Sequence, residues 1–274
     1  MRRVILLTLL ALAALALSTA FAQDRPTAYG KNGMVVAAHP ISAQIGQQIL
    51  SNGGNAVDAA VASAAAVGLM EPNLSGPLGV GYLLFYSPEI GEVRGLEFGG
   101  RGPAELAVDK FEDDIERRRT AKSIADPGNI AGWVTVLEEH GTMSVAEVFA
   151  PVIELAEDGW PLSPELASSF NSFVSRFDYE ETVAAFGKPG GGEWQAGDLY
   201  TNQGYADVLR AVAEEGPEVV YGGRIGQEIV DTIQKYDGFM TIEDLANYEP
   251  EWMTPVSTDY RGYTVYTTAP PSTG

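Results

Sequence analysis

The 274-residue sequence contains no cysteine and only two histidines. Without cysteine the chain can form no disulfide, no thiolate nucleophile and no cysteine-ligated metal site. The histidines, His39 and His140, lie far apart, and neither belongs to a metal-ligand spacing such as HExxH. Because His39 precedes Pro40 at the start of a predicted helix, we expect it to form a structural hydrogen bond. The sequence thus predicts no metal site and calls for no cofactor.

Basic residues are also scarce. The chain has 17 lysines and arginines against 37 acidic residues, for a formal net charge of −20. A nucleic-acid partner would require a basic patch that neutralises phosphates, so the composition argues against nucleic-acid binding. The acidity predicts a solvated surface that repels other acidic molecules.

Long apolar runs are missing after the first 22 residues. The N-terminus combines two arginines, an apolar stretch over 4–17 and the small residues Ala20 and Ala22. This order is typical of a secretory signal peptide, here residues 1–22 with cleavage after Ala22. The alternative is a membrane anchor, but the run is shorter than the roughly 20 residues of a spanning helix. We expect a mature chain of residues 23–274 that is periplasmic or secreted, without stable membrane insertion.

Hydrophobic periodicity indicates an α/β protein. It predicts helices over 41–50, 56–70, 130–140, 145–158, 203–215 and 224–236, with another helix starting at Thr241. Residues 82–86 and 94–98 read as two strands of a hairpin. Residues 263–267 alternate apolar or aromatic with hydroxyl side chains, which predicts a half-buried strand. We expect an exposed helix or loop over 109–122 and a flexible surface loop over 186–194.

Glycines at 76, 79 and 81 could suggest a nucleotide-binding loop. They precede a predicted strand instead of following one, and the P-loop lysine is missing. Glycines in this position are expected to let backbone segments approach each other or a substrate closely.

The stretch GMVVAAHPISAQIGQQILSNGGNAVDAAVASAAAVGLMEPNLSG, residues 33–76, closely resembles the start of mature gamma-glutamyltransferases, also called glutathione hydrolases. The similarity continues through DPGNIAGWVTVLEEHG, from Asp126, and through FMTIEDLANYEPEWMTPVSTDYRGYTVYTTAPPSTG, which ends at Gly274. It covers nearly all of the mature chain, in order.

This resemblance implies the αββα sandwich of N-terminal-nucleophile hydrolases, present only in part in 23–274. Family members are precursors that cleave themselves into a large and a small chain. The new N-terminal threonine of the small chain attacks a gamma-glutamyl amide, such as glutathione, with its own amine as base. Water, an amino acid or a peptide then accepts the gamma-glutamyl group.

No threonine of this sequence matches the family's nucleophile motif, so the resemblance assigns no catalytic residue here. We expect the 274 residues to be the first part of the large chain, a truncated or fragmentary product that is inactive alone. Their expected partners are the small subunit of the same precursor, the small-molecule substrate and the acceptor.

One substrate-binding residue of the family is expected within the sequence. Many members clamp the substrate's α-carboxylate with an arginine in an F-R-E-x-A-P segment, a task suited to a planar guanidinium. Here the segment reads FGGRGP, residues 98–103, and Gly99 stands at the arginine's place. A second family pattern, G-S-G-R-A-P, matches Arg101. We hypothesise that Arg101 binds the carboxylate from a shifted position; the alternative is a structural or surface arginine.

The departure at FGGRGP, with Leu78 and Val80 in place of usual glycines, keeps other functions open. One alternative is an N-terminal-nucleophile amidase or acylase with a different substrate, such as a cephalosporin acylase. Another is an exported, non-catalytic protein that retains the fold.

Overall fold

The computed structural model describes residues 27–177 and 179–272, so the predicted signal peptide at 1–22 lies outside it. The chain divides after Met34 into two units. The described part of the first unit, residues 27–34, contains neither helix nor strand. Every helix and strand that the structure describes lies in the second unit, residues 35–274.

The first two described helices match their expected ranges to within one residue at each end. Helix α2 spans Pro40–Ser51, and α3 spans Ala56–Met70. Gly53 between them adopts a φ of +99°, a left-handed conformation that glycine tolerates after a helix. Asn55 and Asp58 form a reciprocal capping box at the start of α3, which satisfies backbone N–H groups that a helix leaves unpaired.

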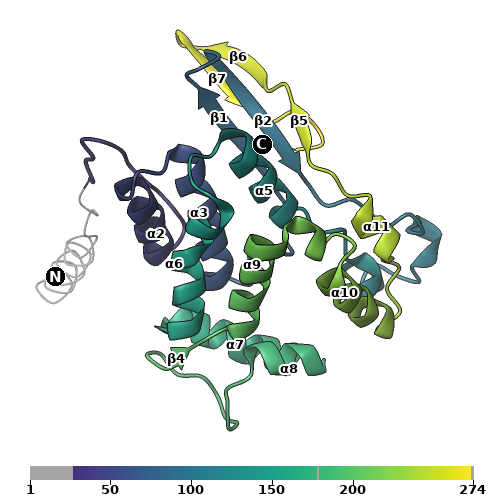
Figure 1. Ribbon diagram of the computed structural model, residues 1–274. Coiled ribbons are helices and arrows are strands. Elements are labelled where there is room, and N and C mark those ends of the chain that lie inside the picture. Colours follow the sequence, from purple (N-terminus) through teal and green to yellow (C-terminus); the bar gives the residue numbers. More distant parts are fainter. Residues whose placement is uncertain (1–26, 178, 273–274) are drawn as a thin grey trace, which may run out of the picture. The chain divides into compact units, whose positions relative to one another are not determined.

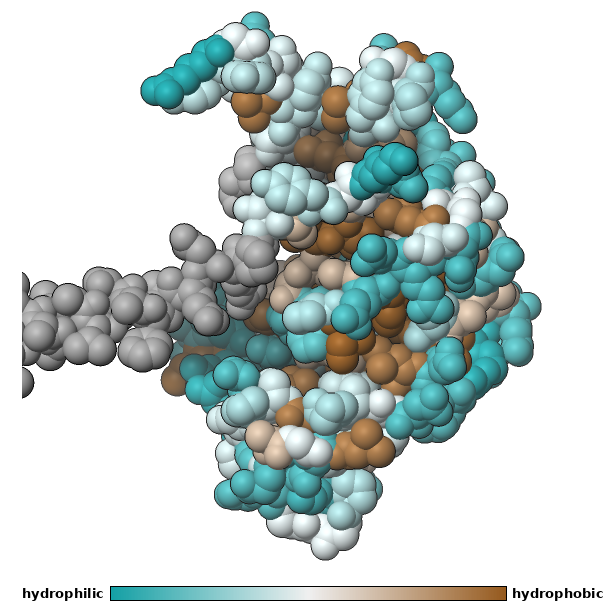
Figure 2. All heavy atoms as spheres, turned by 90° about the vertical axis from the view of Figure 1, so that its left-hand side faces the viewer, coloured by the Kyte–Doolittle hydropathy of each residue, from teal (hydrophilic) through white to brown (hydrophobic). Residues whose placement is uncertain are grey.

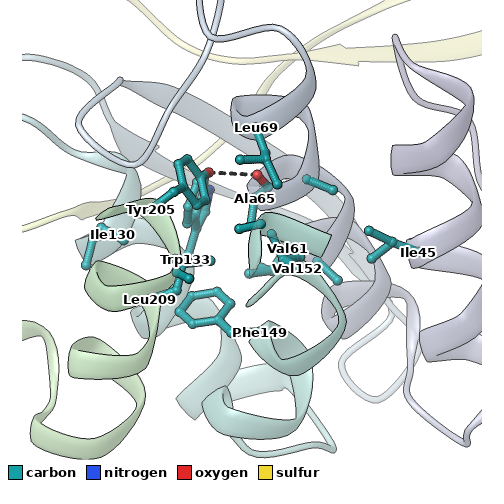
Figure 3. Packing of buried hydrophobic residues seen from close by; sticks show 14 of the residues in the cluster. Ile45, Val61, Ala65, Leu69, Ile130, Trp133, Phe149, Val152, Tyr205 and Leu209 are labelled. Atoms are coloured by element: carbon teal, nitrogen blue, oxygen red, sulfur yellow. Dashed lines mark hydrogen bonds between the residues drawn. The ribbon is translucent and has the colours of Figure 1, made fainter. Parts of the chain in front are cut away.

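Helix α3 is the centre of the core. Its many alanines allow α2, α5 (Asn129–His140) and α6 (Val145–Asp158) to pack against it, while α9 (Gln203–Glu215) packs against α6. Figure 3 shows side chains of these helices meeting in one hydrophobic cluster. The hydroxyl of Tyr205 donates a 2.7 Å hydrogen bond to the carbonyl of Ala65, which ties α9 to α3 as well. Most residues of α3 are buried, so the helix serves as a scaffold for its neighbours.

The remaining helices include two that the sequence did not predict. These are α7 (Pro164–Arg176) and α8 (Glu180–Phe186), beside the expected α10 (Arg224–Lys235) and α11 (Ile242–Ala246). Residues 109–122 form short, mostly exposed turns that include α4 (Glu116–Arg119), as expected.

The expectation of a flexible surface loop at 186–194 is wrong at its end. Trp194 is buried there, because its backbone exchanges two hydrogen bonds with the Asn171 side chain of α7.

The main sheet contains three antiparallel strands in the order β1-β2-β5, drawn beside α5 in Figure 1. Their bounds are Gly81–Ser87, Glu92–Phe98 and Glu251–Met253, so the predicted hairpin is confirmed. Alternate residues face opposite sides of a strand. Leu96 and Phe98 of β2 are buried in the core on the side of α5. On the opposite face, Tyr82 and Tyr86 of β1 remain exposed.

Two small sheets complete the structure. Strands β3 (Trp160–Pro161) and β4 (Leu199–Tyr200) pair over two residues. Strands β6 (Val256–Tyr260) and β7 (Tyr263–Thr267) form a separate hairpin.

The β6–β7 hairpin corrects one expectation. The strand at 263–267 exists, but all of β6 and four of the five residues of β7 are exposed, so it is not half-buried. The apolar and aromatic side chains on it are uncovered: Val256, Tyr260, Tyr263, Val265 and Tyr266. Figure 2, which shows one face of the molecule, also has hydrophobic residues uncovered at several places between hydrophilic ones.

Candidate functional site

Arg101 lies just beyond the end of β2, where its backbone pairs with residue 126. Its carbonyl accepts a 2.8 Å hydrogen bond from the N–H of Asp126, forming an isolated antiparallel bridge. Glycine is required nearby at 128, because a Cβ there would overlap the Phe98 carbonyl and the Tyr248 hydroxyl. The segments 98–103 and 126–128 are therefore held in close backbone contact.

The guanidinium of Arg101 lies against the segment that leads into β5. Its Nη2 donates to Glu251 Oε1 at 2.5 Å and to the backbone carbonyl of Glu249 at 3.0 Å. The guanidinium carbon is 5.5 Å from the centre of the Tyr248 ring. The Arg101 side chain remains 45% exposed. In the described part of the chain Nε and Nη1 have no hydrogen-bond partner, so donors remain for a ligand carboxylate.

Two stacked tyrosines, Tyr221 and Tyr248, hold the backbone segments next to Arg101. The rings of Tyr221 and Tyr248 lie 5.6 Å apart at 18°. The Tyr248 hydroxyl donates to the Gly99 carbonyl at 2.8 Å, and the Tyr221 hydroxyl donates to the Pro127 carbonyl at 2.9 Å. Burial raises the pKa of Tyr248 to about 12. Tyr248 thus stays a neutral donor at physiological pH and holds the backbone next to Arg101.

Asp126 adds a buried carboxyl group to the site. Asp126 is only 4% exposed, and its Oδ1 has no hydrogen-bond partner among the described residues. Burial, together with the nearby charge of Asp244, raises the pKa of Asp126 to about 6, while Arg101 acts in the opposite direction. The site therefore contains one carboxyl that is costly to ionise.

Gly99 faces the open side of the sheet. A Cβ built on Gly99 would lie 3.2 Å from Glu97 Oε1 and 3.2 Å from the Tyr82 hydroxyl. Tyr82, Glu97 and Glu251 form one row across β1, β2 and β5, on the face opposite the core. Gly99 and Arg101 continue the chain beyond β2 on the same face, since Gly99 lies beside Glu97 and Arg101 contacts Glu251.

The glycine-rich segment 76–81 packs against the same region. The Gly79 carbonyl accepts hydrogen bonds from the N–H groups of Gly128 and Asn129, at 2.9 and 3.0 Å. The Asn129 side chain donates to the Gly76 carbonyl at 2.6 Å. A Cβ on Gly68 of α3 would lie 2.8 Å from the Gly76 Cα. The expected close approach of backbone segments is confirmed.

The histidines lie outside this site. His39 caps α2 by accepting a hydrogen bond from Ile41 N–H at 3.2 Å, as expected for a structural role. It also lines a cleft of about 580 Å³ that Arg101 does not line. His140 ends α5, where its Nε2 lies 3.0 Å from Nη1 of Arg94 and its ring contacts Trp252.

Sequence reasoning singled out Arg101 but not its neighbours Asp126, Tyr248 and Glu251. About 150 residues separate Arg101 from Glu251, and no local pattern signals an ion pair at that distance. A weak signal exists in the segment NYEPEW, residues 247–252, whose acidic residues flank a proline between a helix and a strand.

Comparison with known proteins identifies the family. A model of the family described as gamma-glutamyltranspeptidase matches residues 42–274. The chain belongs to the gamma-glutamyltranspeptidase family. It is 36% identical to the glutathione hydrolase proenzyme of Escherichia coli (strain K12) over 252 residues, covering 89% of this chain and 43% of that protein.

Two further proteins, an acylase and a gamma-glutamyltranspeptidase of known structure, are also similar to this chain. The acylase ACY 1 proenzyme of Pseudomonas sp. (strain V22) is 35% identical over 264 residues, which are 92% of this chain and 47% of that protein. The crystal structure of Helicobacter pylori gamma-glutamyltranspeptidase superposes with a TM-score of 0.85 at 31% identity, covering 90% of this chain and 72% of that one. The expected fold, a partial N-terminal-nucleophile hydrolase sandwich, is confirmed.

The chain spans less than half the length of the Escherichia coli glutathione hydrolase proenzyme and of the acylase ACY 1 proenzyme. The family is one of enzymes, and its glutathione hydrolase and acylase members are both similar to this chain. Among residues 27–177 and 179–272, no helix combines the length and the apolar character needed to cross a membrane.

Proposed function

We propose that this chain is the N-terminal part of a gamma-glutamyl hydrolase or transferase that acts on glutathione and related gamma-glutamyl amides. The family membership and the glutathione hydrolase relatives support this substrate class. A threonine outside the 274 residues would attack the amide carbonyl through its hydroxyl, displace the amine and form an ester. Water or an acceptor amine would then release the glutamyl group. The N-terminal 22 residues would act as an export signal to the periplasm or the medium.

The half-exposed guanidinium of Arg101 carries the proposal. It stands at the end of β2 on the open sheet face, with Nε and Nη1 unpartnered in the described chain. Its backbone is held by Asp126, and Tyr248 lies below it. A substrate α-carboxylate would bind there by charge-assisted hydrogen bonds. Arg101 would thus perform the role that Gly99 cannot.

A small subunit from the same precursor is the proposed partner. The face of β1 with Tyr82 and Tyr86, and the β6–β7 hairpin, carry exposed apolar and aromatic side chains that a second layer would cover. An isolated two-stranded hairpin is at best marginally stable in water, so further strands would stabilise it. Since the nucleophile would come with this partner, we propose that the 274 residues alone do not hydrolyse gamma-glutamyl anilides.

The test of Arg101 is a substitution in the full-length protein. Arg101→Ala should raise KM for a gamma-glutamyl anilide at least tenfold, because a charge-assisted carboxylate bond is lost. The matched control is Arg224→Ala, which removes another exposed arginine–glutamate pair far along the sequence, on α10. KM should not change in this control. An unchanged KM in Arg101→Ala would remove the proposed role.

A second function is favoured by Gly99 and by the acylase relative. The family's usual arginine is missing at 99, and the acylase ACY 1 proenzyme is 35% identical to this chain. The same nucleophile chemistry could then act on an amide of another acid. A substrate panel that includes gamma-glutamyl and cephalosporin amides compares the two activities directly.

A further inference from the structure

Arg101 is already paired with a carboxylate of its own chain. Its Nη2 lies 2.5 Å from Glu251 Oε1, and both side chains are largely accessible, at 45% and 67% exposure. A substrate carboxylate would meet the same guanidinium. We propose that Glu251 competes with the substrate carboxylate for Arg101 and thereby sets the preference between substrates with and without that carboxylate. This inference rests on the proposed role of Arg101.

The strand register explains why Glu251 needs a cation. Glu251 of β5 lies directly opposite Glu97 of β2, so two carboxylates occupy neighbouring positions on one face of the sheet. Like charges directly opposite in a sheet are destabilising. The Arg101 guanidinium reduces this repulsion through its ion pair with Glu251. Release of Arg101 would expose the repulsion again.

A substrate carboxylate has two ways to bind, and both are weakened. If it takes Nη2, it displaces Glu251, which is then left opposite Glu97 without its counter-ion. If it takes Nε and Nη1, it shares one positive charge with Glu251 at short range. A substrate that lacks the carboxylate meets neither penalty. Glu251 therefore lowers affinity for carboxylate-bearing substrates selectively.

The effect is expected to be moderate, because solvent screens an exposed ion pair. Removing the charge of Glu251 should lower KM for a carboxylate-bearing substrate by roughly 1.4- to fivefold, the range that corresponds to such an exposed pair. The chemical step should keep its kcat, since Glu251 acts on binding of a remote group.

The experiment uses the full-length enzyme and two anilides that differ only in the carboxylate. Gamma-glutamyl p-nitroanilide carries the α-carboxylate, and 4-aminobutyryl p-nitroanilide replaces it with hydrogen. Glu251→Gln should lower KM for the first anilide and leave KM for the second unchanged. The matched control is Glu249→Gln, since Glu249 contacts Arg101 only through its backbone carbonyl. Neither KM should change in this control.

Other outcomes would overturn the inference. An unchanged or higher KM for the glutamyl anilide in Glu251→Gln excludes competition, and an equal fall for both anilides indicates a general effect on the site. Glu251→Ala provides a second removal of the charge, and both variants are compared with wild type by melting temperature. If Arg101→Ala raises KM while Glu251→Gln has no effect, only the competition fails. If Arg101→Ala has no effect, the proposed role of Arg101 fails as well.

Discussion

Replacement of Asp126 by asparagine should stabilise the protein at neutral pH, although it removes a residue of the candidate site. The Asp126 residue is 4% exposed and its Oδ1 has no partner among the described residues. Burial raises the pKa of the carboxyl from 3.8 to about 6, and Asp244 adds to this rise. Asparagine has nearly the shape of the protonated acid but cannot ionise. The backbone bond from residue 126 to the Arg101 carbonyl is retained.

The magnitude follows from proton linkage. A folded-state pKa above the unfolded value means that the folded protein holds the proton more tightly. The contribution of Asp126 to stability is therefore fully present below pH 3.8 and is lost as the pH rises through 6. A rise of about two pKa units corresponds to about 3 kcal/mol of unfolding free energy above pH 7. Asp126→Asn should recover about 2–3 kcal/mol at pH 7.5 and almost nothing at pH 4.

The assay is urea unfolding of both proteins between pH 4 and pH 8, followed by tryptophan fluorescence. The difference in unfolding free energy between Asp126→Asn and wild type should grow from near zero at pH 4 towards its full value above pH 7. Asp109→Asn is the matched control, because Asp109 is exposed and its loss changes the net charge equally. A difference between Asp126→Asn and wild type that is independent of pH would refute the reasoning, since the cost would not arise from ionisation.

Two further predictions concern packing and surface charge. Gly132→Ala should lower the unfolding free energy by about 1–3 kcal/mol, because the new Cβ overlaps the Phe98 ring. Gly204→Ala, where a Cβ meets only an oxygen at 3.7 Å, should instead be neutral or stabilising in thermal melts. Hydrogen bonds, first from Lys235, lower the pKa of Glu181 to about 2, so this pair stabilises the fold above pH 4.5 and loses that contribution as the pH falls. Lys235→Met should move the carboxyl titration of Glu181 upward in NMR spectra; an unchanged midpoint would contradict the assigned cause.

Much of the local structure could be predicted from sequence because its causes are local. The Asn55 and Ser144 caps, each with an acidic residue three positions later, define the starts of α3 and α6. The first hairpin follows from two short segments rich in apolar and aromatic residues and a turn at Gly91, whose φ is +73°. The family could also be recognised, because its motifs are long contiguous segments.

Helix α7 and the burial of Trp194 were not predicted from the local sequence. The start of α7 has a capping serine and Pro164, and Leu166, Phe170 and Phe173 follow at helical spacing, so local signals for this helix were present and were missed. The burial of Trp194 depends on its hydrogen bonds to Asn171, which lies 23 residues away. Likewise, the alternation in 263–267 correctly predicted a strand, but whether a strand is buried depends on what covers it.

By itself the sequence determined the family, the starts of the capped helices α3 and α6 and the arginine to test, since each depends on residues close together in the chain. Only the tertiary structure decided what surrounds that arginine. Glu251 and Tyr248 approach Arg101 because β5 pairs with β2, a contact across about 150 residues. Asp126 becomes costly to ionise because the fold removes it from water. Pairing between distant strands and desolvation are properties of the folded chain, so no local pattern contains them.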